Sequence, residues 1–229
     1  MGWQDRTAKM LGEEAVRALN GARVAVFGLG GVGGNCMEAL VRAGVGHLTL
    51  IDADTVDETN LNRQLIATRE TVGRDKTEAA KERALSINPG CDVTALKLFY
   101  GAETADAVDM ARFDYVADCI DSVSSKLLLI EKCMSSGTKI ISCMGTGNKV
   151  HPEMLEIADI TKTSVCPLAR VMRRELKVRG IAHLTVLFST ETPLTGEGGR
   201  TPGSVSFVPS CAGIMMAGHI IRDILQLTH

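Results

Sequence analysis

The 229-residue sequence lacks several features that would assign it to a familiar class. No two of its seven cysteines form a C-x-x-C pair, which argues against a structural zinc site built from paired cysteines. There is no internal repeat, no low-complexity tract and no apolar leader, and the odd cysteine count then indicates reduced thiols and a cytoplasmic protein. The formal net charge is only −2, so a nucleic acid would have to bind at a local patch.

The chain does contain an alternation of apolar strands and helical segments. Strands are expected at 24–27, 47–52, 92–99, 115–119, 139–143, 153–159 and 184–188. Helices are expected at 7–20, 33–44, 76–87, 103–110, 123–136, 166–179 and 210–227. This alternation predicts an α/β fold, a Rossmann-like doubly wound sheet with a parallel N-terminal half and a mixed or antiparallel C-terminal extension. We expect one domain over 1–229, with a nucleotide-binding half at 21–148 and a half for substrate and dimer contacts at 149–229.

Residues 23–64 organise the rest of the chain. An apolar strand is followed by glycines that are spaced as G-x-G-G-x-G and open a helix. Such glycines let backbone N–H groups approach a phosphate closely. An aspartate ends the next strand, where its carboxylate can accept hydrogen bonds from ribose hydroxyls. The stretch therefore predicts a nucleotide site that includes Gly28, Gly30, Gly31, Gly33 and Asp52.

Further polar residues decide which nucleotide is expected. Two cations close to a glycine turn suit a triphosphate better than an uncharged nicotinamide ring. A further acid after the strand at 115–119 suits magnesium. Taken singly, each charge is better explained as a solvated surface residue, but together they meet at the carboxyl edge of one parallel sheet, where such folds bind ligands. The predicted ATP and magnesium site adds Asp54, Asn60, Arg63, Lys76 and Asp121.

This pattern resembles the adenylating superfamily of ubiquitin-activating enzymes, which includes the molybdopterin- and thiamine-pathway adenylyltransferases. The matching motifs are G-x-G-G-x-G at 28–33, D-x-D-x-V at 52–56, N-L-x-R-Q at 60–64, V-G-x-x-K at 72–76 and C-x-D at 119–121. Within the superfamily the chain looks most like the tRNA threonylcarbamoyladenosine dehydratases. That closer match rests on Arg6-Thr7 with LGEE at 11–14, MGTGNK at 144–149, DITKT at 159–163 with Pro167-Leu168, and PGSVSFVPS at 202–210.

The resemblance implies an ATP-dependent dehydratase that acts on threonylcarbamoyladenosine next to the anticodon of tRNA. The threonyl carboxylate would be activated as an acyl-adenylate, and the neighbouring carbamoyl nitrogen would then close a ring and expel AMP. Asn60, Arg63 and Lys76 would bind the phosphates, Asp52 the ribose and Asp121 magnesium. Arg6 matches the superfamily's N-terminal arginine, which in several members reaches ATP from the other subunit of a homodimer; a loose surface arginine is the alternative. A monovalent cation is a further candidate.

The second half of the chain carries additional candidates. Cys166 lies at an expected helix start, where the helix dipole favours a thiolate, so it is the candidate reactive thiol; an internal cyclisation, however, needs no protein thioester. The stretch 190–204 is expected to be a mobile loop and a candidate lid. The apolar run in 210–227 is too short to span a bilayer, so we expect it in the core or at a dimer interface. Four basic residues share one helix face, which is either solvated or a tRNA patch: Arg170, Arg173, Arg174 and Lys177.

Three other functions stay open. The first is an adenylyltransferase that activates the C-terminal glycine of a ubiquitin-like sulfur-carrier protein; the missing zinc cysteines and the short second half argue against it. The second is a non-catalytic, nucleotide-sensing dimer that recruits a sulfur-transfer partner protein; the presence of Arg63 and Asp121 argues against that. The third is a nicotinamide-dependent dehydrogenase.

Overall fold

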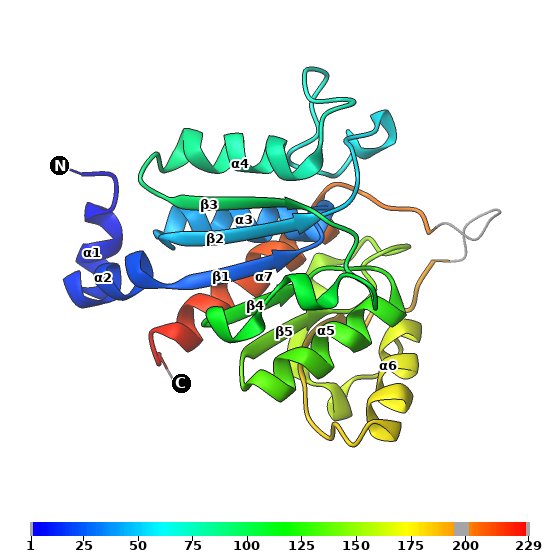
Figure 1. Cartoon of the computed structure of the whole chain (residues 1–229). Coiled ribbons are helices and arrows are strands. Elements are labelled where there is room, and N and C mark those ends of the chain that lie inside the picture. The colour runs from blue at the N-terminus through cyan, green and yellow to red at the C-terminus, as the bar shows by residue number, and fades with distance from the viewer. Residues whose placement is uncertain (1, 195–201, 228–229) are drawn as a thin grey trace.

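The computed structural model describes residues 2–194 and 202–227, and it contains one seven-stranded sheet. The strands follow the order β3-β2-β1-β4-β5-β7-β6. Neighbouring strands are parallel throughout, except that the edge strand β6 runs antiparallel to β7 (Figure 1). The expected fold class is confirmed, because the antiparallel pair lies in the C-terminal part of the chain.

The bounds of the elements are as follows. The strands are β1 (Arg23–Phe27), β2 (His47–Asp52), β3 (Asp92–Lys97), β4 (Tyr115–Asp118), β5 (Lys139–Cys143), β6 (Leu155–Asp159) and β7 (Thr185–Ser189). The α-helices are α1 (Asp5–Leu11), α2 (Glu13–Gly21), α3 (Gly31–Ala43), α4 (Lys76–Ile87), α5 (Val123–Ser136), α6 (Pro167–Val178) and α7 (Phe207–Ile224).

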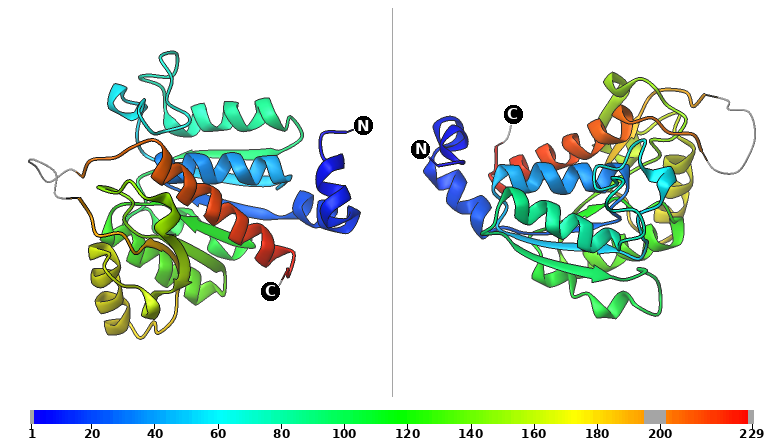
Figure 2. Two further views of the ribbon diagram at one scale, coloured as in Figure 1. Left: turned by 180° about the vertical axis from the view of Figure 1, so that it is seen from behind. Right: turned by 90° about the horizontal axis from the view of Figure 1, so that it is seen from above.

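Helices cover both faces of the sheet. The helices α3, α4 and α7 pack on one face, and α5 and α6 pack on the other (Figures 1 and 2). Because successive side chains of a strand point to opposite faces, Val24 and Val26 of β1 enter the first core and Ala25 and Phe27 enter the second. All four are fully buried, which explains why β1 reads as an unbroken apolar run.

The expected helix over 7–20 is wrong in one respect, because the structure divides it into α1 and α2 at Gly12. Gly12 has a φ of 88°, a left-handed value that favours glycine and that no α-helix contains. The segment expected as a helix at 103–110 forms two short 3₁₀ turns instead, at Ala105–Ala107 and Met110–Arg112. Asp109 separates them, because its side chain accepts a hydrogen bond from Ala111 N–H and begins a new turn.

The C-terminal helix starts earlier than expected, at Phe207 rather than at residue 210. Pro209 lies within the first turn, where its missing N–H costs no helical hydrogen bond. No helix among the described residues combines the length and apolar character that a membrane crossing requires. Of the segment 190–204, where a lid is expected, residues 195–201 lie outside the described residues.

The strand order also fixes where a ligand binds. The strand β1 lies between β2 and β4, so the chain moves outward from β1 in one direction and then in the other. At such a point the loops after neighbouring strands separate and leave a crevice at their carboxyl ends. The segments that follow β1, β2 and β4 are therefore the ones that meet there.

Candidate active site

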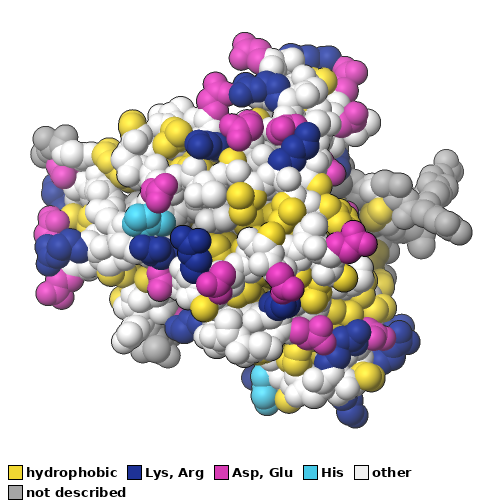
Figure 3. Space-filling view, viewed as in Figure 1, with side chains coloured by type: hydrophobic (Ala, Val, Ile, Leu, Met, Phe, Trp, Pro, Cys, Tyr) yellow, Lys and Arg dark blue, Asp and Glu magenta, His cyan; other side chains and the backbone are white. Residues whose placement is uncertain are grey.

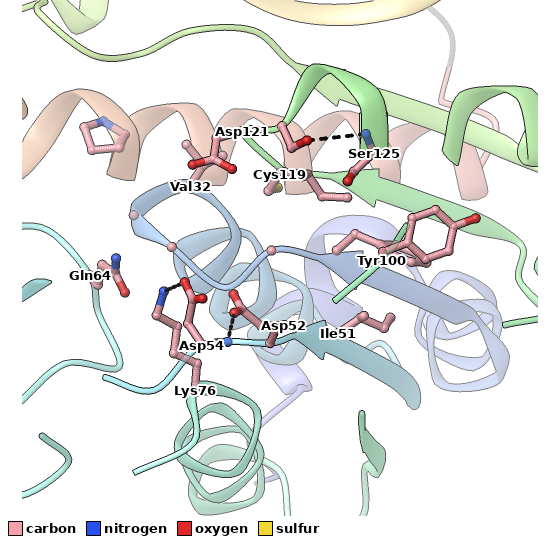
Figure 4. A pocket seen from close by; sticks show the side chains of 18 of the residues that line it. Val32, Ile51, Asp52, Asp54, Gln64, Lys76, Tyr100, Cys119, Asp121 and Ser125 are labelled. Carbon is pink, nitrogen blue, oxygen red and sulfur yellow. Dashed lines mark hydrogen bonds and ion pairs between the residues drawn. The ribbon is translucent and has the colours of Figure 1, made fainter. Parts of the chain in front are cut away.

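A cleft of about 400 Å³ opens at the carboxyl ends of β1, β2 and β4. It brings together nine of the residues that the sequence assigns to nucleotide and metal binding. These are Gly28, Gly30, Gly31, Asp52, Asp54, Asn60, Arg63, Lys76 and Asp121. In the close-up, Lys76 and Gln64 lie on one side and Ile51 and Tyr100 on the other (Figure 4). The cleft therefore has a polar, cationic end and an apolar end.

The glycine turn after β1 is shaped by two close backbone contacts. Gly28 has a φ of 85°, and a Cβ there would lie 2.7 Å from the carbonyl oxygen of Cys119, which directly follows the neighbouring strand β4. A Cβ on Gly33 would lie only 1.8 Å from the Gly28 oxygen. Gly33 therefore lets α3 start directly against the turn rather than lining the cleft itself. The N-terminus of α3 consequently faces the cleft, where its N–H groups favour a bound anion.

Asp52 ties the end of β2 to this turn. One carboxylate oxygen accepts a hydrogen bond from Leu29 N–H at 2.6 Å, and the other accepts one from Asp54 N–H at 2.8 Å. The side chain lines the cleft although the residue is only 8% exposed. Each carboxylate oxygen has a second lone pair, so Asp52 can still accept a hydroxyl hydrogen from a ligand.

Lys76 is the best-defined cation of the cleft. Its side chain is 7% exposed, and its Nζ lies 2.8 Å from Oδ2 of Asp54, which is 68% exposed. The backbone N–H of Lys76 also donates to the Asp54 carbonyl at 3.0 Å, so the start of α4 is fixed to the loop after β2. A buried ammonium group has three donors, and a phosphate is a suitable further acceptor.

Arg63 is held by the short segment that precedes it. Asn60 Oδ1 accepts the Asp57 N–H at 3.0 Å and closes a capping box at the start of this turn. Arg63 Nη1 then donates to the Thr59 carbonyl at 2.9 Å and to Asn62 Oδ1 at 2.8 Å. One edge of the guanidinium is thereby positioned by the protein, which leaves the remaining N–H groups available to a ligand.

Asp121 follows β4, and its exposed side chain lies on the cleft wall. Over the described residues, 2–194 and 202–227, no group of three or more His, Cys, Asp or Glu side chains is arranged to hold a metal ion. Magnesium, however, is commonly bound through one or two carboxylates together with substrate phosphates. A single carboxylate beside a phosphate-binding turn fits that mode, so Asp121 fits magnesium only when a nucleotide is bound.

Several further residues line the cleft besides the nine named above. Gln64 follows Arg63 and lines the cleft, and its buried Oε1 has no hydrogen-bond partner among the described residues. Because a buried polar atom without a partner is costly, Gln64 is a candidate ligand contact. Its position directly after the arginine of N-L-x-R-Q was the available signal. Thr146 also lines the cleft, as expected of a loop at the carboxyl end of the strand at 139–143. Ser204 and Pro209 line it as well, and they come from segments that only the tertiary fold brings near.

An aromatic pair forms the apolar end of the cleft. The rings of Phe27 and Tyr100 meet edge to face with centroids 5.0 Å apart. Both line the cleft, and burial raises the pKa of the Tyr100 hydroxyl well above its ordinary value, so Tyr100 stays neutral. An uncharged aromatic wall suits a nucleobase better than a phosphate.

Arg6 does not lie in this cleft. It is an exposed residue of α1, which packs against α2 at the opposite end of the sheet (Figure 1). The Gln4 side chain lies against Gly44, directly after the C-terminal end of α3, whereas the cleft lies at the N-terminal end. The 13 residues of α3 separate the two ends by about 20 Å. Arg6 therefore cannot reach the cleft of its own chain.

Cys166 immediately precedes α6, as expected, but it is only 2% exposed. A Cβ on Gly145 would lie 3.9 Å from its sulfur, so the thiol is covered by the loop that carries the cleft residue Thr146. An acyl group cannot reach this thiol in the conformation observed. Cys119 does line the cleft, but contact with Cys36 and then burial raise the pKa of its thiol well above the ordinary value.

The basic face of α6 is partly occupied. Arg173 donates to the Thr163 carbonyl at 2.6 Å and also to its hydroxyl, and Arg174 pairs with Glu175 at 2.9 Å. Arg170 and Lys177 are exposed and form no ion pair within the described part of the chain. Basic side chains gather at the lower right of Figure 3, over α6 as seen in Figure 1.

Comparisons with known proteins identify one family. The profile of the ThiF family matches residues 4–229. A tRNA threonylcarbamoyladenosine dehydratase of Bacillus subtilis is 40% identical over 238 residues, which cover 96% of this chain and 94% of that protein. The Escherichia coli protein of the same name is 37% identical over 200 residues, which cover 82% of this chain and 75% of that protein. The crystal structure of the E. coli enzyme in complex with ATP superimposes with a TM-score of 0.91 at 33% identity, covering 98% of this chain and 96% of that one.

Proposed function

The chain belongs to the ThiF family, and we propose that it is an ATP-dependent tRNA threonylcarbamoyladenosine dehydratase. The observation that carries this proposal is the cleft, in which a glycine turn, two cations and a carboxylate meet within a chain that matches its relative over nearly its whole length. A tRNA substrate implies that the protein acts in the cytoplasm.

The first step of the proposed reaction activates a carboxylate. An oxygen of the threonyl carboxylate attacks the α-phosphorus of ATP, the bond to the bridging oxygen breaks, and pyrophosphate leaves. A free carboxylate is a poor electrophile because its negative charge is delocalised, and the acyl-adenylate removes that charge. The protein assists by positioning the two reactants and by stabilising the charge of the leaving group.

The second step closes the ring. The carbamoyl nitrogen attacks the activated carbonyl carbon, loses its proton to solvent, and AMP departs with the former carboxylate oxygen. The sum is one ATP consumed for one AMP and one pyrophosphate, with the elements of water removed from the modified nucleoside. No protein thioester is needed, which agrees with the burial of Cys166.

The residues of the cleft divide these tasks. Asp52 accepts hydrogen bonds from the ribose hydroxyls. Asn60, Arg63 and Lys76 bind the phosphates that become pyrophosphate. The aromatic wall around Tyr100 receives the adenine. Asp121, together with the phosphates, would hold magnesium, which would neutralise part of the triphosphate charge. A monovalent cation stays a prediction.

Two wider features complete the proposal. Arg6 acts across a homodimer, because its own cleft is out of reach and because α1 buries none of its side chains within the chain. The exposed cations of α6 contact tRNA phosphates, since the start of this helix packs beside the loop that lines the cleft.

The deciding experiment measures AMP formed by the purified protein from ATP and magnesium, with threonylcarbamoyl-modified tRNA, with unmodified tRNA or with none. We expect AMP only with the modified tRNA, together with loss of the open form of the nucleoside. Arg63→Ala and Asp121→Ala abolish it, whereas Arg69→Ala, an exposed arginine paired with Glu58, does not. Modified tRNA that keeps its open form after incubation with ATP would refute the proposal.

A pyrophosphate-exchange assay, run with a small carrier protein and with tRNA, tests the sulfur-carrier adenylyltransferase. That function requires pyrophosphate exchange that depends on a small carrier protein rather than on tRNA. A protein that only senses nucleotides and recruits a sulfur-transfer partner would bind ATP but release no AMP with either substrate.

A further inference from the structure

A buried ion pair lies directly behind the wall of the cleft. Asp118 is the last residue of β4 and Lys126 lies in the second turn of α5, and their side chains are 0% exposed. Lys126 Nζ and Asp118 Oδ2 are 2.9 Å apart. Ser142 on the neighbouring strand β5 donates its hydroxyl to the same carboxylate oxygen at 2.5 Å. Neither charged residue belongs to the lining of the cleft.

Both charges also hold the backbone of the residue that follows. Ile120 N–H donates to Asp118 Oδ1 at 3.1 Å, and Lys126 Nζ donates to the Ile120 carbonyl at 2.9 Å. Ile120 lies between Cys119 and Asp121, and all three residues of this turn, 119–121, line the cleft. The ion pair therefore fixes the backbone that carries the Asp121 carboxylate.

The turn is also in close contact with the glycine turn. A Cβ on Gly28 would overlap the carbonyl carbon and oxygen of Cys119, so the two backbones touch where the nucleotide would bind. The glycine turn therefore holds the turn 119–121 at Cys119, whereas the ion pair holds it at Ile120, next to the Asp121 carboxylate.

Stability alone is a weak explanation of such a pair. Desolvation of two charges offsets most of their attraction, and apolar side chains of similar volume often stabilise a core equally well. A fully hydrogen-bonded buried network does, however, specify one local conformation. The contacts here are directed at both backbone groups of a single residue of the cleft wall.

We propose that Asp118 and Lys126 are positioning residues that hold the turn 119–121 in the conformation that binds ATP together with magnesium. This inference rests on the proposed function, in which Asp121 is the protein ligand of the metal. Because the turn would contact the nucleotide chiefly through that carboxylate, loss of the pair should weaken the magnesium-dependent part of ATP binding. Ser142 supports Asp118 in the same role.

The test measures ATP binding by calorimetry without tRNA, once with magnesium and once with EDTA, and records thermal unfolding separately. For Lys126→Met we expect about tenfold weaker binding with magnesium, in the range seen when residues behind a metal ligand are removed. The change in EDTA should stay below about twofold. Ser142→Ala should give a smaller shift of the same kind. Lys132→Met is the matched control, because Lys132 lies on the same helix and pairs with Asp106 at the surface.

The outcomes separate this inference from the proposed function. If Asp121→Ala loses the magnesium effect while folded Lys126→Met and Ser142→Ala keep it, the inference fails and the assignment of Asp121 stands. If Asp121→Ala itself keeps the magnesium effect, the assignment fails and the inference fails with it. Should Lys126→Met not fold, Asp118→Asn decides, because it removes the negative charge of the pair at nearly the same side-chain volume; a folded Asp118→Asn that keeps the magnesium effect refutes the inference.

Discussion

Two adjacent glycines of α3 differ in how much room surrounds them. A Cβ on Gly33 would lie 1.8 Å from the Gly28 oxygen, whereas one on Gly34 would meet nothing closer than the Leu29 oxygen at 3.8 Å. Gly33→Ala must therefore push α3 away from the phosphate-binding turn, and we expect ATP binding to weaken about tenfold or more. Gly34→Ala should bind ATP normally and be more stable by about 0.5–1 kcal/mol, since alanine loses less entropy in a helix. Calorimetry and urea unfolding of both variants check this, and equal ATP affinities would contradict it.

At this scale the sequence predicted residues that belong to local motifs. Asp52 and Lys76 could be found because a strand end and a helix start fix where such side chains point. The roles of Gln64 and Pro209 could not, because they depend on which atoms surround them after folding. Arg6 shows the converse: a motif match identified the residue, but only the fold shows that it lies far from its own cleft.

At the scale of elements, Glu38 joins α3 to α4. Arg83 donates to both of its carboxylate oxygens at 2.8 Å, and Arg42 donates to one of them at 2.9 Å. The hydrogen bonds from Arg83, opposed by burial and supported by Arg42, hold the pKa of Glu38 below its ordinary value of 4.5. A carboxylate with a lowered pKa stabilises the fold above its unfolded-state pKa, and that contribution is lost as the pH falls through the folded-state pKa.

We therefore expect Glu38→Gln to unfold more easily than the natural protein at pH 7, by about 1 kcal/mol. The difference should shrink as the pH falls below about 4.5, where the unfolded chain begins to bind the proton, and it should be lost once the pH is below the lowered folded-state pKa. Urea titrations at pH 7 and at lower pH measure this. Glu82→Gln, which removes an exposed pair with Arg74, serves as the control and should cost little at either pH.

The basic face of α6 gives a second prediction for a single element. Arg170→Ala combined with Lys177→Ala should raise the KM for modified tRNA severalfold and leave the KM for ATP unchanged, because phosphate contacts add affinity without touching the nucleotide. The effect should shrink at higher salt. An unchanged KM for tRNA would show that the substrate binds elsewhere. Arg174→Ala is the comparison, since Glu175 already pairs with that side chain.

The elements themselves illustrate what a sequence can specify. The bounds of β2, α4 and β5 match the expected ranges because strong apolar or helical patterns end at clear signals. The break at Gly12 and the early start of α7 did not follow from such patterns. A single glycine such as Gly12 does not by itself end a predicted helix, and its φ is known only from the structure. Proline usually ends a helix, but Pro209 is tolerated because it lies in the first turn of α7.

At the scale of the whole molecule, the position of Arg6 predicts complementation. Arg6→Ala and Arg63→Ala should each be inactive alone, because one lacks the donated arginine and the other lacks a phosphate contact. Equal mixing with subunit exchange makes half of the dimers mixed, and one of the two clefts in each is then intact. The mixture should recover about a quarter of the natural activity. AMP release by the mixture measures this, and no recovery would show that Arg6 does not act across subunits.

The packing of α7 on α3 has a consequence for how the protein matures in the cell. Pro209 of α7 completes the wall of the cleft, yet α7 is translated after all seven strands. When all seven strands have emerged from the ribosome but α7 has not, the nascent chain still exposes the apolar side of α3 and lacks part of its nucleotide pocket. We therefore expect the nucleotide pocket to be complete only after α7 has left the exit tunnel. A chain cut before α7 would present α3 to chaperones and proteases instead.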